Sequence, residues 1–172
     1  TKTVGVTKFC VHPQSWFKTK DCIGGTKTVS IEKIHELKPD LIIANKEENI
    51  KDQVMLLAKD FPVWVTNVNT LQDALQMIND IGQLTGKQEK AILLANNIKA
   101  NFSVLNNNLP NKSAAYLIWK NPYMTIGADT FIHDMLTRCG FSNMFAQQQR
   151  YPITSIEELK QRGCQLLLLS SE

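Results

Sequence analysis

The first side chains that could do chemistry are Cys10 and His12, near the start of the chain. A thiol beside an imidazole is a pairing used in nucleophilic catalysis, because the imidazole can take the thiol proton. An i, i+2 spacing in a loop fixes no such geometry, so the pair does not predict an enzyme. His12 could instead be an axial ligand of haem or of a cobalt centre, or it could simply be solvated.

Other catalytic and metal motifs are missing from the sequence. His35 and His133 fall in predicted helices without a second ligand at metal spacing, so both are expected to be ordinary helix residues. There is neither a G-x-S-x-G elbow nor a phosphate-binding glycine loop. The four cysteines, which form no CxxC pair, are Cys10, Cys22, Cys139 and Cys164. Two of them could form a disulfide, but buried free thiols are the preferred interpretation.

Large aromatic and apolar side chains give a stronger indication of function, namely the binding of a ligand. Such side chains bind a flat or apolar ligand by stacking and by burying its surface. The candidates are Phe9, Trp16, Trp119, Tyr123, Met124 and Tyr151. Core packing is the alternative for Trp64 and Trp119, which lie in predicted strands. Carboxylates of the ligand, or an anionic siderophore, could be met by Lys8, Lys27, Lys120 and Arg150.

Composition excludes other classes of protein. The net charge of +3 comes from 19 basic and 16 acidic residues with no block of like charge, so we expect no nucleic-acid partner. The longest apolar run, Leu166 to Leu169, is far short of the ~18 residues that a membrane span needs. The chain begins at Thr1 and shows no basic-then-apolar leader, so a signal peptide is neither present in it nor excluded for the protein.

The elements that position these residues follow from hydrophobic periodicity and caps. In the first 70 residues the expected order is a strand at 3–7, an aromatic loop at 9–17 and a turn at Gly24-Gly25. A helix capped by Ser30 and stopping before Pro39, a strand at 41–44, a helix at 49–59 and a strand at 62–68 follow. This alternation predicts an α/β fold with a doubly wound parallel sheet and right-handed crossovers.

The middle of the chain is helical. Two helices are expected between residues 70 and 107, and the second, at about 87–107, would run roughly 30 Å and could bridge two lobes. The run Asn106-Asn107-Asn108-Leu109-Pro110 ends it. A second α/β unit follows, with strands at 114–119 and 166–169 and with helices at 130–139 and after Ser155. The predicted segments are therefore 1–70, 71–110 and 111–172.

A short internal repeat links the two α/β segments. Ser30-Ile31-Glu32 and Ser155-Ile156-Glu157 both precede a helix and then an apolar strand. Two similar lobes with a binding cleft between them are the expected arrangement. Each glutamate could be part of a helix start, or Glu32 and Glu157 could be matched carboxylates that meet a two-fold symmetric partner.

The order of these motifs resembles the class III periplasmic binding proteins, with Leu37 to Ile43 as the most diagnostic stretch. The likeness is greatest to the cobalamin-binding, or helical-backbone metal receptor, members. It implies two Rossmann-like lobes with parallel sheets joined by a single long helix. It also implies a chain clipped at both ends, with one strand and helix expected before Thr1 and further segments after Glu172.

The same resemblance assigns roles to individual residues. The loop from Phe9 to Trp16 would face the ligand, with Phe9 and His12 where the family contacts a corrinoid, and Asn121-Pro122 would introduce Met124 as an apolar contact. Tyr151 would close on the ligand from the second lobe. Cobalamin binders of this family carry tryptophans at two positions where this chain differs. It has Thr26 or Lys27 at the first and Asn45 at the second. Glu32 and Glu157 match the family's transporter-docking carboxylates.

These observations predict the substrate-binding component of an ABC importer, not an enzyme, located in the periplasm or lipid-anchored outside the membrane. Its cargo would be a corrinoid, haem or ferric siderophore held in the inter-lobe cleft and passed to a membrane permease, with no cofactor of its own. The predicted ligand-binding residues are Phe9, His12, Trp16, Lys27, Asn45, Tyr123, Met124, Arg150 and Tyr151. The alternative is a two-lobed α/β enzyme or metallocluster-handling protein.

Overall fold

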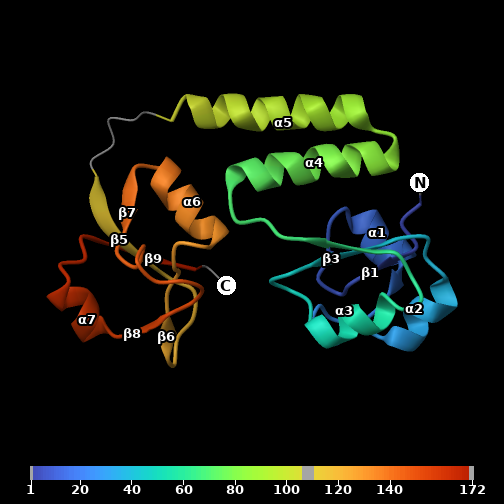
Figure 1. Cartoon of the computed structure of the whole chain (residues 1–172), viewed down its shortest axis with the longest axis horizontal. Helices are drawn as coiled ribbons and strands as arrows, with labels where there is room; N and C mark the ends of the chain where they lie inside the picture. The colour runs from blue at the N-terminus through green and yellow to red at the C-terminus, as the bar shows by residue number, and fades with distance from the viewer. Residues whose placement is uncertain (1, 106–110, 171–172) are drawn as a thin grey trace. The chain divides into compact units, whose positions relative to one another are not determined.

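Parallel strand pairs joined by short helices build both halves of the chain (Figure 1). The computed structural model describes residues 2–105 and 111–170. Two units result, Thr1–Asn67 and Val68–Glu172. The helical segment predicted to bridge two lobes belongs to the second unit, and its bridging role stays a prediction. The predicted terminator at 106–110 lies outside the described residues.

Unit 1 contains two pairs of parallel strands and three helices. The strands are β1 (Gly5–Val6), β2 (Asp21–Cys22), β3 (Ile42–Asn45) and β4 (Val63–Thr66), and the helices are α1 (Gln14–Thr19), α2 (Ile31–Leu37) and α3 (Lys51–Leu57). β1 pairs with β2, and β3 pairs with β4. The predicted parallel alternation is confirmed in these pairs, while the described strands are hydrogen-bonded as two sheets rather than one.

The caps of α2 explain why it forms where the sequence predicts. The hydroxyl of Ser30 accepts a hydrogen bond of 3.3 Å from the backbone N–H of Lys33, which satisfies one of the donors left free at a helix start. The helix ends at Lys38, which has a left-handed φ of 45°, immediately before Pro39.

Two expectations for unit 1 were wrong, and one strand was missed. The aromatic segment at 9–17 is not a loop throughout, because α1 begins at Gln14. The short strand β2 was not predicted, since two residues carry no periodicity. Ile43 in β3 is 51% exposed, whereas we expected both faces of this strand to be covered. The described chain therefore leaves part of the sheet open.

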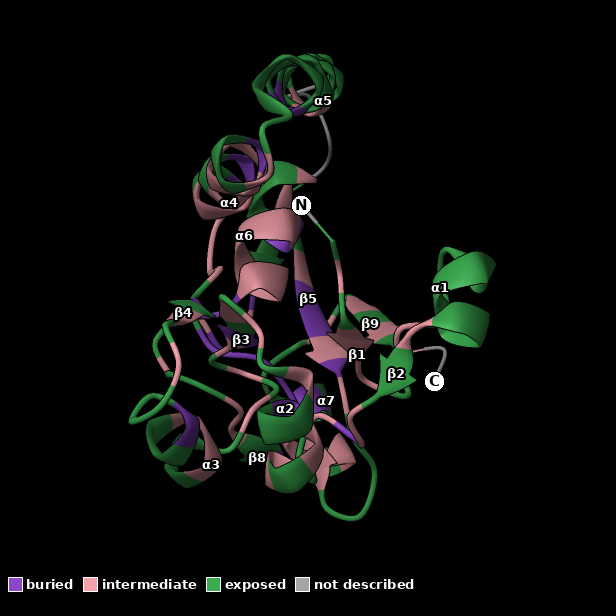
Figure 2. Cartoon of the chain, turned by 90° about the vertical axis from the view of Figure 1, so that its right-hand side faces the viewer, coloured by how far each residue is buried: buried purple, intermediate pink, exposed green. Residues whose placement is uncertain are grey.

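Unit 2 begins with a helical hairpin. α4 (Leu71–Thr85) and α5 (Gln88–Ser103) lie side by side (Figures 1 and 2). They pack closely at Gly82, where an added Cβ would lie 2.3 Å from the Cβ of Ala91. The 16 residues of α5 span about 24 Å, so the helix is shorter than the predicted 87–107.

A three-stranded parallel sheet forms the rest of unit 2. β5 (Lys112–Leu117) lies between β7 (Phe141–Asn143) and β9 (Leu166–Leu169), with α6 (Phe131–Arg138) and α7 (Ile156–Gln161) as its helices. An antiparallel pair, β6 (Tyr123–Met124) and β8 (Ile153–Thr154), is separate from it. The core centres on β5 and contains Ala115, Leu117, Phe145 and Leu159. The predicted α/β class with parallel sheets is confirmed, although β6, β7 and β8 were not predicted.

Candidate functional site

The carboxyl ends of β3 and β4 form one edge of unit 1. Asn45 and Thr66 end these strands and are register partners. In open α/β sheets, ligands bind beyond the carboxyl ends of the strands. Asn45, predicted to bind ligand, therefore lies at the edge where the fold favours a site.

The side chain of Asn45 is engaged in a network of hydrogen bonds. Its Oδ1 accepts from the backbone N–H groups of Glu47, at 2.9 Å, and Glu48, at 3.2 Å. Its Nδ2 donates to Thr66 Oγ1 at 3.2 Å, and that hydroxyl donates to the carbonyl of Ala44 at 3.0 Å. Asn45 thus shapes the loop between β3 and α3. A direct contact from Asn45 to a ligand stays a prediction.

A second loop, the turn Gly24–Thr28, is tied to this one. Asn49 Oδ1 accepts from the backbone N–H of Asn45 at 2.8 Å, while its Nδ2 donates to the carbonyl of Thr26 at 2.9 Å. Lys27 Nζ donates to the carbonyl of Glu47 at 2.6 Å. Lys27, predicted from sequence, and Asn49, which the sequence reading missed, therefore join the same two loops.

The aromatic segment after β1 presents apolar side chains to solvent. Phe9 is 62% exposed and Trp16 38% exposed, and His12 is also exposed. Every residue of α1 is exposed, as Figure 2 shows. The ammonium group of Lys8 lies 5.2 Å from the centre of the Phe9 ring. Exposed large apolar residues that lie together often mark a binding surface, whereas single scattered ones are common on any protein.

The predicted residues of unit 2 come together from two separate segments. Tyr123 and Met124 form β6, and Met124 pairs with Ile153 of β8. The backbone N–H of Thr125 donates to the carbonyl of Pro152 at 2.9 Å, and that of Gly127 donates to the carbonyl of Arg150 at 2.7 Å. The segment that carries Arg150 and Tyr151 therefore runs alongside the segment that carries Tyr123 and Met124.

Arg150 is held in a defined position in this arrangement. It has a left-handed φ of 59°, and its backbone N–H donates to Asp129 Oδ1. Its guanidinium lies 3.9 Å from Asp129 Oδ2 and 5.1 Å from the centre of the Tyr151 ring. Trp119, which bridges to Met124, is 64% exposed, so core packing was the wrong alternative for it.

The two repeated glutamates occupy equivalent helix positions. Glu32 and Glu157 are the second residues of α2 and α7, each two residues after a serine whose hydroxyl caps the helix. Both side chains are exposed. Hydrogen bonding from its own backbone N–H and from the Ser155 hydroxyl lowers the pKa of Glu157, which keeps it charged. The docking role of both glutamates stays a prediction.

The histidines and cysteines form no cluster in the described part of the chain. His35 Nε2 lies 3.6 Å from Asp60, and His133 Nδ1 lies 3.1 Å from the buried Asn143 amide. Among residues 2–105 and 111–170, no three His, Cys, Asp or Glu side chains lie close enough to hold a metal ion. The four thiols are free, but none is buried and Cys22 is exposed, so the expectation of buried thiols was wrong.

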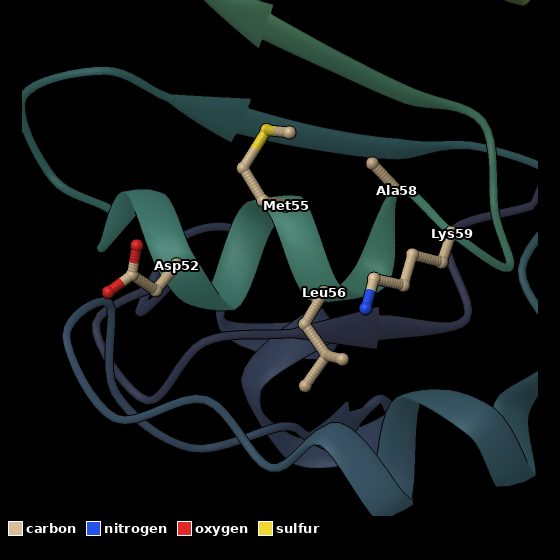
Figure 3. A pocket seen from close by; sticks show the side chains of 5 residues that line it. All are labelled: Asp52, Met55, Leu56, Ala58 and Lys59. Atoms are coloured by element: carbon tan, nitrogen blue, oxygen red, sulfur yellow. The ribbon is translucent and has the colours of Figure 1, made fainter.

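A shallow hollow on α3 carries none of the predicted ligand residues (Figure 3). It is lined by Asp52, Met55, Leu56, Ala58 and Lys59, all on one helix or directly after it. Met55 and Leu56 are exposed apolar residues that point in different directions from the helix. Ligand pockets draw polar and apolar groups from several elements, so this hollow does not form a candidate site.

The family of the chain follows from comparison with known proteins. The periplasmic binding protein family matches residues 1–172, so this chain is a member of that family, as the sequence predicted. The family is one of binding proteins and not of enzymes. None of the helices in the described residues has the length and apolar character needed to cross a membrane.

Two relatives illustrate the likeness in sequence. The vitamin B12-binding protein of Salmonella typhimurium is 25% identical over 174 residues, which cover 98% of this chain and 65% of the relative. An ABC transporter substrate-binding lipoprotein of Bacillus subtilis is 28% identical over 158 residues, which cover 86% of this chain and 50% of the relative. The chain thus spans less than two thirds of the length of these relatives.

Solved structures share the fold. The periplasmic vitamin B12-binding protein of Vibrio cholerae superposes with a TM-score of 0.85 at 22% identity, over 98% of this chain and 68% of that one. A periplasmic haem-binding protein in complex with two haems gives a TM-score of 0.80 at 15% identity, over 99% of this chain and 68% of that one. At these identities the likeness is one of fold alone.

Proposed function

We propose that this chain is part of the ligand-capturing subunit of an ABC importer, and that its cargo is a corrinoid, haem or ferric siderophore. The observation that carries the proposal is that each unit presents an aromatic, basic-flanked surface. Unit 1 has Phe9 with Lys8 and the exposed helix α1, and unit 2 has Tyr151 with Arg150 beside β6. Relatives of known name bind vitamin B12 or haem.

Both surfaces suit a large planar metal chelate. Aromatic rings stack on such a ligand, and cations held beside the rings can meet its carboxylates. The proposed contacts in unit 1 are Phe9, His12 and Trp16, with Lys27 and Asn45 at the same edge. Those in unit 2 are Tyr123, Met124, Arg150 and Tyr151. His12, which is exposed, is available as an axial ligand to iron or cobalt.

Delivery would follow from docking onto a membrane permease. Glu32 and Glu157 are exposed carboxylates in matching positions of two units, which is the arrangement that a two-fold symmetric permease with basic residues would meet. A periplasmic or lipid-anchored location outside the membrane fits this role, and the Bacillus subtilis relative is a lipoprotein.

The test is a titration of the full-length protein against cyanocobalamin, cobinamide, haemin and a panel of ferric siderophores, followed by visible absorbance and tryptophan fluorescence. One of them should bind saturably, and a nanomolar Kd corresponds to about 12 kcal/mol. Phe9→Ala and Tyr151→Ala should each weaken that binding about tenfold or more, because they remove an aromatic contact. Leu93→Ala, at a 63% exposed position on α5, is the matched control and should bind normally. Failure of every ligand to bind the unmodified protein would overturn the proposal.

A further inference from the structure

Two loops of unit 1 are connected by hydrogen bonds to the segment that carries the exposed Phe9. The first connection is between the β3–α3 loop and the turn Gly24–Thr28, through Asn49. Its Oδ1 accepts from the backbone N–H of Asn45 at 2.8 Å, and its Nδ2 donates to the carbonyl of Thr26 at 2.9 Å. Asn49 is therefore bonded on one side to the strand end and on the other to the turn.

The second connection is between that turn and the aromatic segment. The backbone N–H of Lys8 donates to the carbonyl of Gly24 at 2.9 Å. Gly25 is buried, and a Cβ added to it would lie 3.3 Å from Lys8 Cε and 3.7 Å from Phe9 Cε2. The Lys8 side chain and the edge of the Phe9 ring, which form the cation–π pair, thus lie next to the turn at Gly25.

We propose that Asn49 is a positioning residue that holds Phe9 and Lys8 in place through the turn Gly24–Thr28. The inference rests on the proposed function for its purpose, because it assigns to Asn49 a part in preorganising the ligand surface of unit 1. An exposed aromatic ring on a mobile loop would lose conformational entropy on binding, and a loop fixed beforehand avoids that cost.

The substitution that separates the two bonds of Asn49 is Asn49→Asp. A carboxylate keeps the acceptor for the backbone N–H of Asn45 but cannot donate to the carbonyl of Thr26. Amide hydrogen exchange by NMR then reports each side separately. The amides of Lys8 and Gly25, which bond to Gly24 and Thr28, should lose protection by about tenfold. The amide of Asn45 should keep its protection.

Two further variants complete the exchange experiment. Asn67→Asp places the same charge at an exposed position just after β4, and it should leave the Lys8 and Gly25 amides unchanged. Gly25→Ala crowds the other end of the connection, because its Cβ would lie 3.0 Å from Thr28 Oγ1 and 3.3 Å from Lys8 Cε. It should loosen the Lys8 amide without affecting Asn45. Unchanged protection at Lys8 and Gly25 in Asn49→Asp would overturn the proposal, as would an equal loss at Asn45, which would mean general unfolding of the region.

Binding provides the second measurement. For whichever of haemin or cyanocobalamin saturates the full-length protein, Asn49→Asp should weaken binding about tenfold while Asn67→Asp leaves it unchanged. Equal affinity of Asn49→Asp and the unmodified protein would overturn the proposed positioning role. Failure of both probes to bind the unmodified protein would count against the proposed function, and the exchange result would then decide the positioning role alone.

Discussion

The carboxylate of Asp134 in α6 accepts a hydrogen bond of 2.7 Å from the backbone N–H of Leu71, the first residue of α4. The same oxygen accepts from Arg138 Nε at 2.7 Å. The carboxylate of Asp73 accepts hydrogen bonds from the backbone N–H groups of the two residues that precede Leu71, Asn69 and Thr70. Two carboxylates thus satisfy three successive donors at the start of α4, where the helix dipole also favours negative charge.

Asp134→Ala should lower the free energy of unfolding of unit 2 by about 1–2 kcal/mol, because it leaves the Leu71 N–H without its partner and removes a charge from the helix start. Chemical denaturation of the purified protein measures this. Arg138→Ala removes only an exposed i, i+4 ion pair, so it should cost no more than about 0.5 kcal/mol. Equal losses in the two variants would contradict the capping role of Asp134.

Asp73 should make the stability of α4 depend on pH. Hydrogen bonds from the Thr70 side chain and the Asn69 backbone lower the pKa of Asp73 in the folded protein. A lowered pKa means that the stabilisation is present above the unfolded-state pKa, about 3.9, and is lost as the pH falls through the folded-state pKa. The stability difference between the unmodified protein and Asp73→Asn should therefore be largest near neutral pH and should shrink below about pH 4. A difference that stays constant over denaturation curves at several pH values would disprove this.

Gly127→Ala should disturb the ligand surface proposed for unit 2. An added Cβ would lie 2.5 Å from the Gln148 carbonyl oxygen and 2.7 Å from backbone atoms of Gln149, so the segment leading to Arg150 must move. We expect a loss of stability of about 1–3 kcal/mol and weaker ligand binding. Denaturation and ligand titration measure the two effects. Ala128→Ser, at the exposed neighbouring position, should change stability by less than about 0.5 kcal/mol and should leave binding intact.

Charge reversal should separate docking from capture. Glu32→Lys combined with Glu157→Lys should abolish uptake of the ligand by cells while its affinity for the purified protein stays unchanged, because both residues are exposed at helix starts and neither is a proposed ligand contact. Glu36→Lys, near the end of the same helix as Glu32, is the control for added charge and should transport normally. Normal uptake by the double variant would exclude the docking role.

Local patterns in the sequence were sufficient for the longer strands and for every described helix except α1, which was expected to be part of a loop. Ser30 and Ser155 each predicted a helix start, and each hydroxyl accepts the expected hydrogen bond. Thr130 caps α6, which ends at Arg138 within the predicted helix at 130–139, and Gly140 follows with a positive φ of 77°. These features depend on a few neighbouring residues, because a cap joins positions three apart and a glycine permits its own positive φ.

The short strands could not be predicted in this way. β2, β6, β7 and β8 contain two or three residues each, which is too few for a period-2 pattern to be recognised. They form because a partner strand supplies hydrogen bonds from a distant part of the chain. The exposure of the cysteines and of Trp119 was misjudged for a similar reason, since residue type gives only an average tendency to be buried.

The sequence by itself determined the α/β class, the family, the order of the main elements and the aromatic and basic residues available for a ligand. Those properties are written in composition, periodicity and motif order. Only the tertiary structure decided that Asn49 joins the β3–α3 loop to the Gly24–Thr28 turn, that Asp134 caps α4 and that the segment of Arg150 runs beside β6. Each of these contacts joins residues more than 20 positions apart, and the choice of partner at that range depends on how the whole unit packs.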